Sequence, residues 1–307
     1  MTYSVFDGNR RLSQDAAAFI AAAEDNYNRQ LAEIADYIAA HRDTCPIVLI
    51  SGPSGSGKTT TALMLEHKLD NRGLETHTLS QDNFFRTLTD NDKRLLEQGE
   101  LDLESPARVD EELLNRQLTD IIAGKPVELT EFDFRTHTRR PSGKTLTRQP
   151  GEVVILEGIH TLNPHVVQLP ESQTVRLYVS VRTRVEGPRG AQLHPKYIRL
   201  LRRMLRDVQH RGRRPEDTLG MFHSVNLGEE RFIMPYKHRS TFDVDTFFAY
   251  EMNVYRTYLL EELQGLADKP EIAEILPILS AAEGLEASAV PETALIREFI
   301  GDSFFHK

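Results

Sequence analysis

Short apolar runs alternate with helical patterns along most of the chain. The candidate strands are residues 47–50, 75–79, 153–156, 175–181 and 243–248, and the first is a continuous apolar run typical of a buried parallel strand. Between them, apolar residues recur at helical spacing in residues 59–69, 111–123, 196–209 and 250–266. Strands that alternate with helices predict an α/β fold with a mainly parallel sheet, covered by helices on both faces.

Two further segments lie outside this alternation. Residues 16–41 place apolar side chains at helical spacing, which predicts an amphipathic helix that packs on the domain rather than on a partner. The composition changes after Lys269, and the rest of the chain is expected to form short helices. We therefore expect a helical extension over residues 1–45, an α/β domain over residues 46–269 and a helical appendage over residues 270–307.

A glycine-rich loop separates the first strand of the domain from its first helix. Residues 52–59 read GPSGSGKT and fit the phosphate-loop pattern G-x-x-x-x-G-K-[ST]. In this pattern backbone N–H groups turn inward around phosphates, the lysine reaches the terminal phosphates, and the hydroxyl that follows it ligates Mg²⁺. The residues expected to bind the nucleotide are Gly52, Pro53, Ser54, Gly55, Ser56, Gly57, Lys58, Thr59 and Thr60. The loop predicts ATP or GTP, with Mg²⁺ on Thr59.

Two carboxylates follow predicted strands, at the sheet edge where open α/β sheets bind ligands. Asp82, in SQDNFF, is placed to accept the proton of an alcohol, although an aspartate that only caps a turn gives the same pattern. Glu157, in VVILEGIH, follows four apolar residues, where a carboxylate can orient water or Mg²⁺ beside the phosphate loop. Both residues are candidates for phosphoryl-transfer chemistry.

Basic residues gather in the segment RRMLRDVQHRGRR of an otherwise acidic chain. Arg203 and Arg206 are three residues apart and share a helix face. Gly212 is expected to end the helix and to let Arg211 and Arg213 close over a nucleotide. Because guanidinium groups position and neutralise phosphates, the cluster is interpreted as a lid. A solvated basic helix face is the alternative.

The composition of the chain indicates which kinds of partner the protein can bind and in which compartment it is expected. The chain has 307 residues and a net charge of −9, from 37 basic and 46 acidic residues, which argues against broad nucleic-acid binding. No apolar stretch approaches the roughly 20 residues of a membrane span, and the N-terminus lacks the apolar region of a signal peptide. The single Cys45 cannot form an internal disulfide. These features predict a cytoplasmic protein that does not bind membranes, and they are compatible with a homo-oligomer.

The chain resembles the uridine kinase and phosphoribulokinase family of P-loop kinases, most closely its uridine kinase-like members. The resemblance spans residues 46–260 and is carried, in order, by GPSGSGKTT, SQDNFF, LESPARVD, EFDFRTHTR, VVILEGIH and RRMLRDVQHRGR. It implies a P-loop kinase fold with a five-stranded parallel sheet, and transfer of the γ-phosphate of ATP, with Mg²⁺, to the 5′-hydroxyl of a nucleoside such as uridine or cytidine.

The same resemblance implies roles for single residues. Asp82 corresponds to the general base, and Thr59 and Glu157 correspond to the residues beside the magnesium ion. The lid and transfer residues are Lys58, Arg206 and Arg211. The residues implied for the acceptor side are Asp82, Phe85, Glu104, Phe132, His137, Arg203 and Arg213.

Three positions depart from the pattern of uridine kinases, and all three belong to the acceptor side. Phe132 stands where tyrosine is common, Glu104 where aspartate is common, and Met221 where glutamine is common. Phenylalanine and methionine cannot make the hydrogen bonds of tyrosine and glutamine. The phosphate chemistry is therefore specified more closely than the acceptor.

Two other functions fit the same motifs. A P-loop kinase of another small alcohol, such as a sugar phosphate or pantothenate, would keep the fold and change the acceptor. A nucleotide-gated interaction protein would use hydrolysis as a switch, and then no small alcohol would raise ATP turnover. The leading prediction is a phosphotransferase whose acceptor is the alcohol group of a nucleoside, with the choice between ATP and GTP left open.

Overall fold

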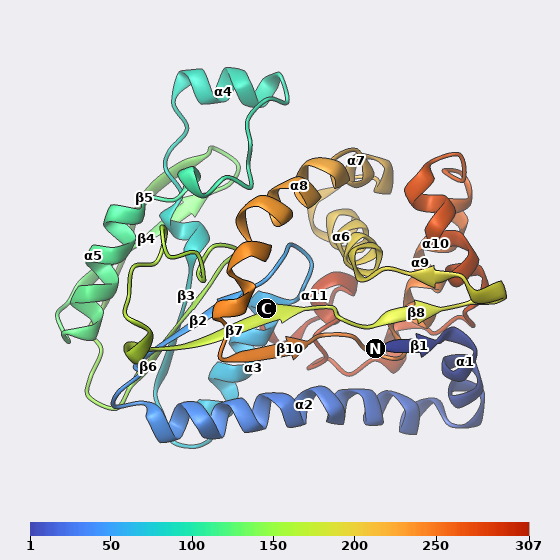
Figure 1. Ribbon diagram of the computed structural model, residues 1–307, viewed down its shortest axis with the longest axis horizontal. Helices are drawn as coiled ribbons and strands as arrows, with labels where there is room; N and C mark the ends of the chain where they lie inside the picture. Colours follow the sequence, from blue (N-terminus) through green and yellow to red (C-terminus); the bar gives the residue numbers. More distant parts are fainter. Residues whose placement is uncertain (307) are drawn as a thin grey trace.

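The computed structural model describes residues 1–306 and places five strands in one parallel sheet (Figure 1). The strands are β2 (Ile47–Ser51), β3 (Thr76–Ser80), β6 (Val153–Glu157), β7 (Thr174–Ser180) and β10 (Phe242–Asp245), in the spatial order β10-β7-β2-β6-β3. All neighbouring strands run parallel, and β2, β6 and β7 are buried along their whole length. The predicted α/β class and five-stranded parallel sheet are confirmed.

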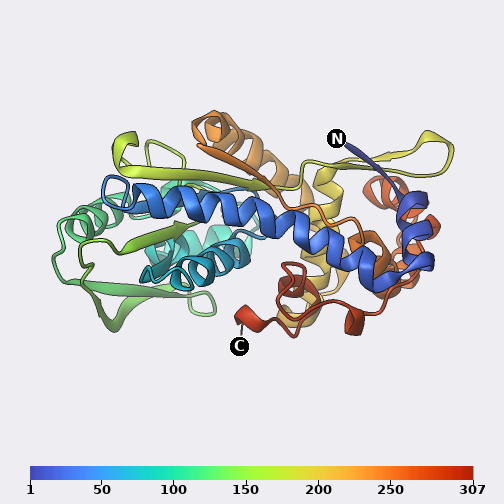
Figure 2. The same cartoon turned by 90° about the horizontal axis from the view of Figure 1, so that it is seen from below.

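Helices cover both faces of this sheet, which explains why its central strands are apolar throughout. Alternate residues of β2 face two separate hydrophobic cores. The first core is covered by α2 (Ala16–His41) and α3 (Lys58–Asp70), and the second by α5 (Glu111–Ile122). Figure 2 shows the long helix α2 running beside the sheet for much of the length of the molecule. The predicted packing role of residues 16–41 is confirmed by the buried side chains of α2.

In addition to the predicted elements, the structure has two small sheets and, in the N-terminal third of the chain, two short helices. One sheet is a hairpin of β4 (Val127–Asp133) and β5 (Thr138–Leu146), and the other joins β1 (Thr2–Ser4), β8 (Arg184–Glu186) and β9 (Gln192–Leu193). The helices are α1 (Val5–Gln14) and α4 (Asp90–Glu97). The sequence of β5, TRRPSGKTL, is largely polar and exposed. Such strands give no hydrophobic period, which is why the sequence did not predict them.

Four helices complete the domain around the carboxyl ends of the strands: α6 (Pro195–Arg211), α7 (Pro215–Gly220), α8 (Phe222–Phe232) and α9 (Glu251–Gln264). Gly212 ends α6 in the left-handed conformation, with φ of 61°, as predicted. The strand predicted for residues 243–248 ends earlier, at Asp245. The Asp245 side chain accepts a hydrogen bond from the backbone N–H of Phe247 and turns the chain there.

The C-terminal segment, expected as an appendage of short helices, packs into the main core. Its helices are α10 (Pro270–Ala281) and α11 (Arg297–Ile300). Ile275, Leu295 and Phe299 are fully buried in the same core as the side chains of α2 and α9. Figure 1 places α11 next to α6. Within residues 1–306, no helix combines the length and the hydropathy needed to cross a membrane.

Candidate active site

The loop of residues 52–57 leaves β2 and enters α3 through three glycines in conformations that other residues avoid. Gly52, Gly55 and Gly57 have φ of 157°, 75° and 84°. A Cβ on Gly52 would lie 1.9 Å from the carbonyl oxygen of Val179, so no side chain fits at this position. The left-handed Gly57 turns the chain into Lys58, the first residue of α3. The positive end of this helix therefore points into the loop, as anion binding requires.

Helix α6 and the turn after β10 hold the outer side of this loop. Arg199, Arg202 and Thr246 donate hydrogen bonds of 3.2, 3.3 and 2.8 Å to the carbonyls of residues 54, 55 and 56, respectively. With these carbonyls bound from outside, the loop can present N–H groups on its inner side. These supports could not be predicted from the sequence, because Arg199 and Arg202 look like the other arginines of α6 and only tertiary contacts separate their roles.

Arg202 is itself held by a buried ion pair. The side chains of Arg202 and Glu251 are fully buried at an N–O distance of 2.9 Å, and Glu251 also accepts a hydrogen bond of 2.9 Å from the hydroxyl of Tyr255. Burial acts to lower the pKa of Arg202, but the charge of Glu251 outweighs it and raises the pKa above its usual value. The guanidinium therefore stays charged and is locked in place behind the loop.

Lys58 points back along the inside of the loop. Its Nζ donates a hydrogen bond of 3.1 Å to the carbonyl of Pro53. Burial lowers the pKa of Lys58, and the carboxylates of Glu157, Glu298 and Asp82 oppose the shift. Asp82 and Glu157 were predicted from the sequence as site residues, whereas Glu298 was not.

Two buried polar atoms beside the loop lack a hydrogen-bond partner within residues 1–306. They are Ser56 Oγ and Arg203 Nε. Arg203 packs directly on the loop, since a Cβ on Gly55 would lie 3.1 Å from the Arg203 Cγ. An unpaired buried donor costs about 1–3 kcal/mol, and phosphate oxygens accept hydrogen bonds from hydroxyl and guanidinium groups of this kind. These residues therefore fit a bound nucleotide.

Asp82 and Glu157 lie at the same edge of the sheet. Ser80, the last residue of β3, is paired in register with Glu157, the last residue of β6, and Asp82 follows in the next turn. Burial raises the pKa of both carboxyls, to about 7 for Glu157, where the charge of Asp82 adds to the shift. Lys58 opposes the shift in both. The predicted base and the predicted magnesium-side carboxylate thus share one environment with the loop lysine.

Glu104 lies on the loop after α4, packed against α8. A Cβ on Gly228 of α8 would lie 2.4 Å from the Cβ of Glu104, so this contact requires glycine. Burial raises the pKa of Glu104, and the charges of Arg203 and Lys58 oppose the shift. His160 is 1% exposed near the backbone of Glu104, and burial lowers its pKa to about 4. This neutral imidazole was not predicted from the sequence, where its only signal is its position three residues after the strand-end carboxylate Glu157.

Three phenylalanines meet on the predicted acceptor side. The rings of Phe85 and Phe132 are 5.6 Å apart and those of Phe132 and Phe134 are 5.2 Å apart, both edge to face. His137 lies in the turn of the β4–β5 hairpin with a left-handed φ of 54°. Its carbonyl accepts a hydrogen bond of 3.1 Å from the N–H of Leu88. The hairpin is therefore docked on the segment that carries Phe85.

Asp207 organises the predicted lid. This fully buried carboxylate lies 3.3 Å from Arg206 and 3.2 Å from Arg211, and it accepts a hydrogen bond of 3.0 Å from the hydroxyl of Thr218. It thereby joins α6 to α7 and orients both arginines. The pKa of Arg211 is lowered by burial and by Arg206, and the charge of Asp82 is among those that oppose the shift. Arg211 thus faces the same site as the predicted base.

Arg213 has a different position from the other predicted arginines. It is exposed, and its Nη1 lies 3.8 Å from the sulfur of Met221, which stands at the third departure from the uridine kinase pattern. The structure therefore brings Arg203, Arg206 and Arg211 to the side of α6 that faces the phosphate loop. Arg213 follows the end of α6 and is not part of this group.

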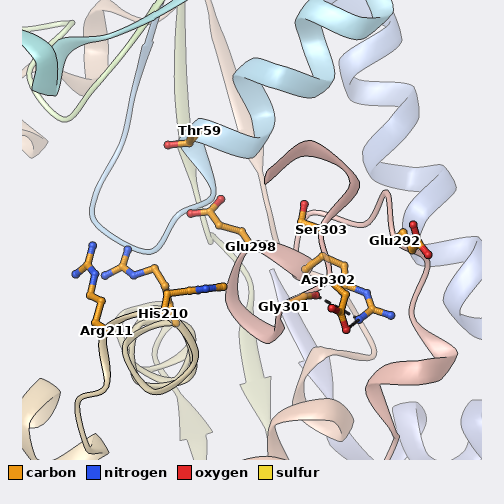
Figure 3. Close-up of a pocket in the computed structure, with 10 residues that line it drawn as sticks. Thr59, His210, Arg211, Glu292, Glu298, Gly301, Asp302 and Ser303 are labelled. Atoms are coloured by element: carbon orange, nitrogen blue, oxygen red, sulfur yellow. Dashed lines mark hydrogen bonds and ion pairs between the residues drawn. The ribbon is translucent and has the colours of Figure 1, made fainter. Parts of the chain in front are cut away.

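A cavity of about 790 Å³ opens beside Thr59, between α6 and the C-terminal segment (Figure 3). It is lined by Thr59, Arg206, His210, Arg211, Glu292, Arg297, Glu298, Gly301, Asp302 and Ser303. Figure 3 shows the carboxylate of Glu298 pointing toward Thr59, and its Oε2 lies 2.5 Å from the hydroxyl of Thr60. The volume is in the range of small-molecule sites. No sequence motif marks the C-terminal lining residues, so the sequence did not predict a site here.

Comparisons with known proteins agree with this geometry. The model of the Phosphoribulokinase / Uridine kinase family matches residues 47–247. Uridine-cytidine kinase 2-B of Danio rerio is 32% identical over 197 residues, which cover 62% of this chain and 69% of that protein. The uridine kinase of Deinococcus deserti is 32% identical over 178 residues, covering 57% and 75%, and that of Staphylococcus epidermidis is 32% identical over 192 residues, covering 62% and 83%. The predicted resemblance is confirmed: the chain belongs to the Phosphoribulokinase / Uridine kinase family, and is thus a P-loop kinase that uses ATP to phosphorylate an alcohol group.

Proposed function

We propose that the chain transfers the γ-phosphoryl group of ATP to the 5′-hydroxyl of a nucleoside of the uridine or cytidine type. The observation that carries the proposal is the shared environment of Asp82, Glu157 and Lys58 at the mouth of the phosphate loop. Similar relatives that are named as uridine kinases support the choice of acceptor.

In this proposal Asp82 takes the proton of the acceptor hydroxyl. The acceptor oxygen forms a bond to the γ-phosphorus as the bond between that phosphorus and the β-γ bridging oxygen breaks, and ADP leaves with the electron pair. A carboxylate with a raised pKa suits the role of general base. Lys58, Arg206 and Arg211 neutralise the charge that develops on the transferred group.

Mg²⁺ would be held by the hydroxyl of Thr59 with Glu157 nearby, and would neutralise charge on the phosphate oxygens. Among residues 1–306, no group of three or more His, Cys, Asp and Glu side chains could hold a metal by itself. This fits Mg²⁺, which usually takes one or two protein oxygens and completes its shell with phosphates and water.

The acceptor would lie against Phe85 and Phe132, whose rings suit the face of a base. Glu104 and His137 would supply polar contacts, with Arg203 between acceptor and phosphates. Arg213 would reach the acceptor only after lid closure. A sugar phosphate or pantothenate is the alternative acceptor, and a reducing cytoplasm is the proposed compartment.

The test is a panel of acceptors with Mg²⁺ and ATP. Uridine, cytidine, purine nucleosides, sugar phosphates, pantothenate and no acceptor are compared for ADP release, and each product is identified by mass. We expect a nucleoside 5′-monophosphate from the wild type and none from Lys58→Ala, since the loop lysine neutralises the moving phosphoryl group. Lys68→Ala, later on the same helix, is the matched control. If no alcohol raises ADP release above the rate with water, the nucleotide-gated interaction protein replaces the kinase.

A further inference from the structure

The C-terminal segment of residues 291–306 is a fixed wall beside the phosphate loop, although it lies outside the residues that match the family. Leu295 is fully buried, and a Cβ on Gly57 would lie 2.7 Å from its Cδ2. Arg297 is 6% exposed and donates a hydrogen bond of 2.6 Å to the carbonyl of Val290. Such packing indicates a permanent part of the site rather than a strap that opens and closes.

The cavity between this segment and α6 has walls of opposite charge. The α6 wall carries Arg206, His210 and Arg211. The C-terminal wall carries Glu292, Glu298 and Asp302 together with one cation, Arg297, which lies 4.0 Å from Asp302, so acidic groups predominate on this wall. A nucleotide has the matching polarity, because its phosphates are anionic and its nucleoside carries N–H and O–H donors.

The position of the cavity along α3 gives the direction of the nucleotide. The terminal phosphates are expected at Lys58, and the cavity begins at the next residue, Thr59. Glu298 reaches the following residue, Thr60, at 2.5 Å. The nucleoside end of a bound nucleotide would therefore extend past Thr59 and Thr60 into the cavity, along the acidic wall.

We propose that residues 291–306 form the nucleoside-binding wall of the donor site, where Glu298 and Asp302 accept hydrogen bonds from the ribose hydroxyls and base N–H groups of the bound nucleotide. This inference rests on the proposed use of ATP and adds the part of the chain that recognises its nucleoside. Arg206, His210 and Arg211 on the α6 wall would then contact the phosphates and the opposite face of the base.

The test compares ATP with inorganic tripolyphosphate, which carries the phosphates without the nucleoside. Binding of each to the full chain with Mg²⁺ is measured by calorimetry, without an acceptor. The variants are Glu298→Gln, which keeps an acceptor for Thr60, and Asp302→Asn, which suits the left-handed φ of 56° at that residue. Glu286→Gln, exposed and outside the cavity, is the matched control, and thermal melting checks that each variant folds.

We expect the wild type to bind ATP at least roughly tenfold more tightly than tripolyphosphate, and each cavity variant to weaken ATP by roughly tenfold without weakening tripolyphosphate, as for loss of a charged hydrogen bond. The control should change neither affinity. Equal affinity of the wild type for the two ligands would overturn the inference, as would variants that leave ATP binding unchanged. Variants that bind both ligands more tightly would also overturn it, because the wall would then repel phosphate. If ATP binding behaves as expected but no acceptor is phosphorylated, the proposed function fails and the inference stands.

Discussion

Arg202 of α6 donates a hydrogen bond of 3.3 Å to the carbonyl of Gly55, at the outer side of the phosphate loop. The same guanidinium pairs with Glu251 at the start of α9. A single buried side chain thus connects the loop with two helices that are far from it in sequence. Because the loop is rich in glycine and has little stiffness of its own, its binding geometry depends on such supports.

Variants of Arg202 should show that its effect on the stability of the fold is distinct from its effect on ATP binding. Arg202→Leu leaves Glu251 buried without its partner, so we expect the free energy of unfolding to fall by about 3–5 kcal/mol. The double variant Arg202→Leu, Glu251→Leu should recover most of this loss, because it removes both buried charges. ATP affinity should stay weak in both, since neither variant holds Gly55. Denaturant unfolding and calorimetry measure the two quantities, and normal ATP affinity in the double variant would contradict the supporting role.

Asp82→Asn should retain ATP binding and lower kcat by roughly 10²–10⁴-fold, the usual contribution of a positioned general base. The shape of the side chain is kept and its ability to take a proton is lost. Steady-state kinetics with a saturating acceptor measures the effect, with the exposed Asp90→Asn as control. If only the KM for the acceptor changed, Asp82 would be a binding residue.

Arg211→Ala should lower kcat more than it weakens ATP affinity. Half of the Arg211 side chain is exposed in its contact with Asp207, so its contacts to phosphate are expected to complete when the lid closes. We expect a loss in kcat of roughly tenfold or more, as for a charged hydrogen bond made in the transition state. Arg231→Ala, exposed on α8, is the control. Wild-type kinetics in Arg211→Ala would restore the interpretation of a solvated basic face.

The aromatic acceptor side should discriminate weakly among nucleosides. Phe132 and Met221 offer no strong hydrogen-bonding group to the edge of a base, and an apolar site distinguishes substrates by about 10–200-fold per group, against about 10⁴-fold for a hydrogen-bonding site. We therefore expect the kcat/KM for uridine to exceed that of the next nucleoside by less than about 200-fold. His137→Ala should impair the acceptor step and spare ATP affinity. A uridine preference of about 10⁴-fold would show polar readout by residues other than these.

Glu24 should make the chain less stable as the pH rises. It is 8% exposed on α2, accepts a hydrogen bond of 2.5 Å from the hydroxyl of Tyr250, and burial raises its pKa from 4.5 to about 7. Between these two values the folded chain holds a proton that the unfolded chain has released, so the free energy of unfolding falls as the pH rises.

Glu24→Gln removes this titration and keeps an acceptor for Tyr250. We expect the variant to be more stable than the wild type at pH 8 by on the order of 1–3 kcal/mol, with no such gain at pH 4. Urea unfolding at the two pH values measures the difference, and Glu33→Gln, exposed on the same helix, is the control. An equal effect at both pH values would assign the change to packing instead of titration.

The five strands of the parallel sheet and the phosphate loop could be predicted because their signals are local. A buried parallel strand must be apolar along its length, as in β2 and β6, and a loop that bends around phosphates needs glycine at Gly52, Gly55 and Gly57. Asp82 and Glu157 could be named as candidates for the same reason, since each lies at the carboxyl end of a strand: Glu157 is the last residue of β6, and Asp82 comes two residues after β3.

The different roles of the arginines of α6 could not be predicted, because they depend on the packing of segments that are distant in the sequence. Arg199 and Arg202 support the loop while Arg206 and Arg211 line the cavity, and nothing in their spacing distinguishes these roles. The same is true of Glu298, which lies 238 residues from its partner Thr60. A helical repeat specifies which side chains share a face, but the partners of that face come from segments that only the folded core brings together.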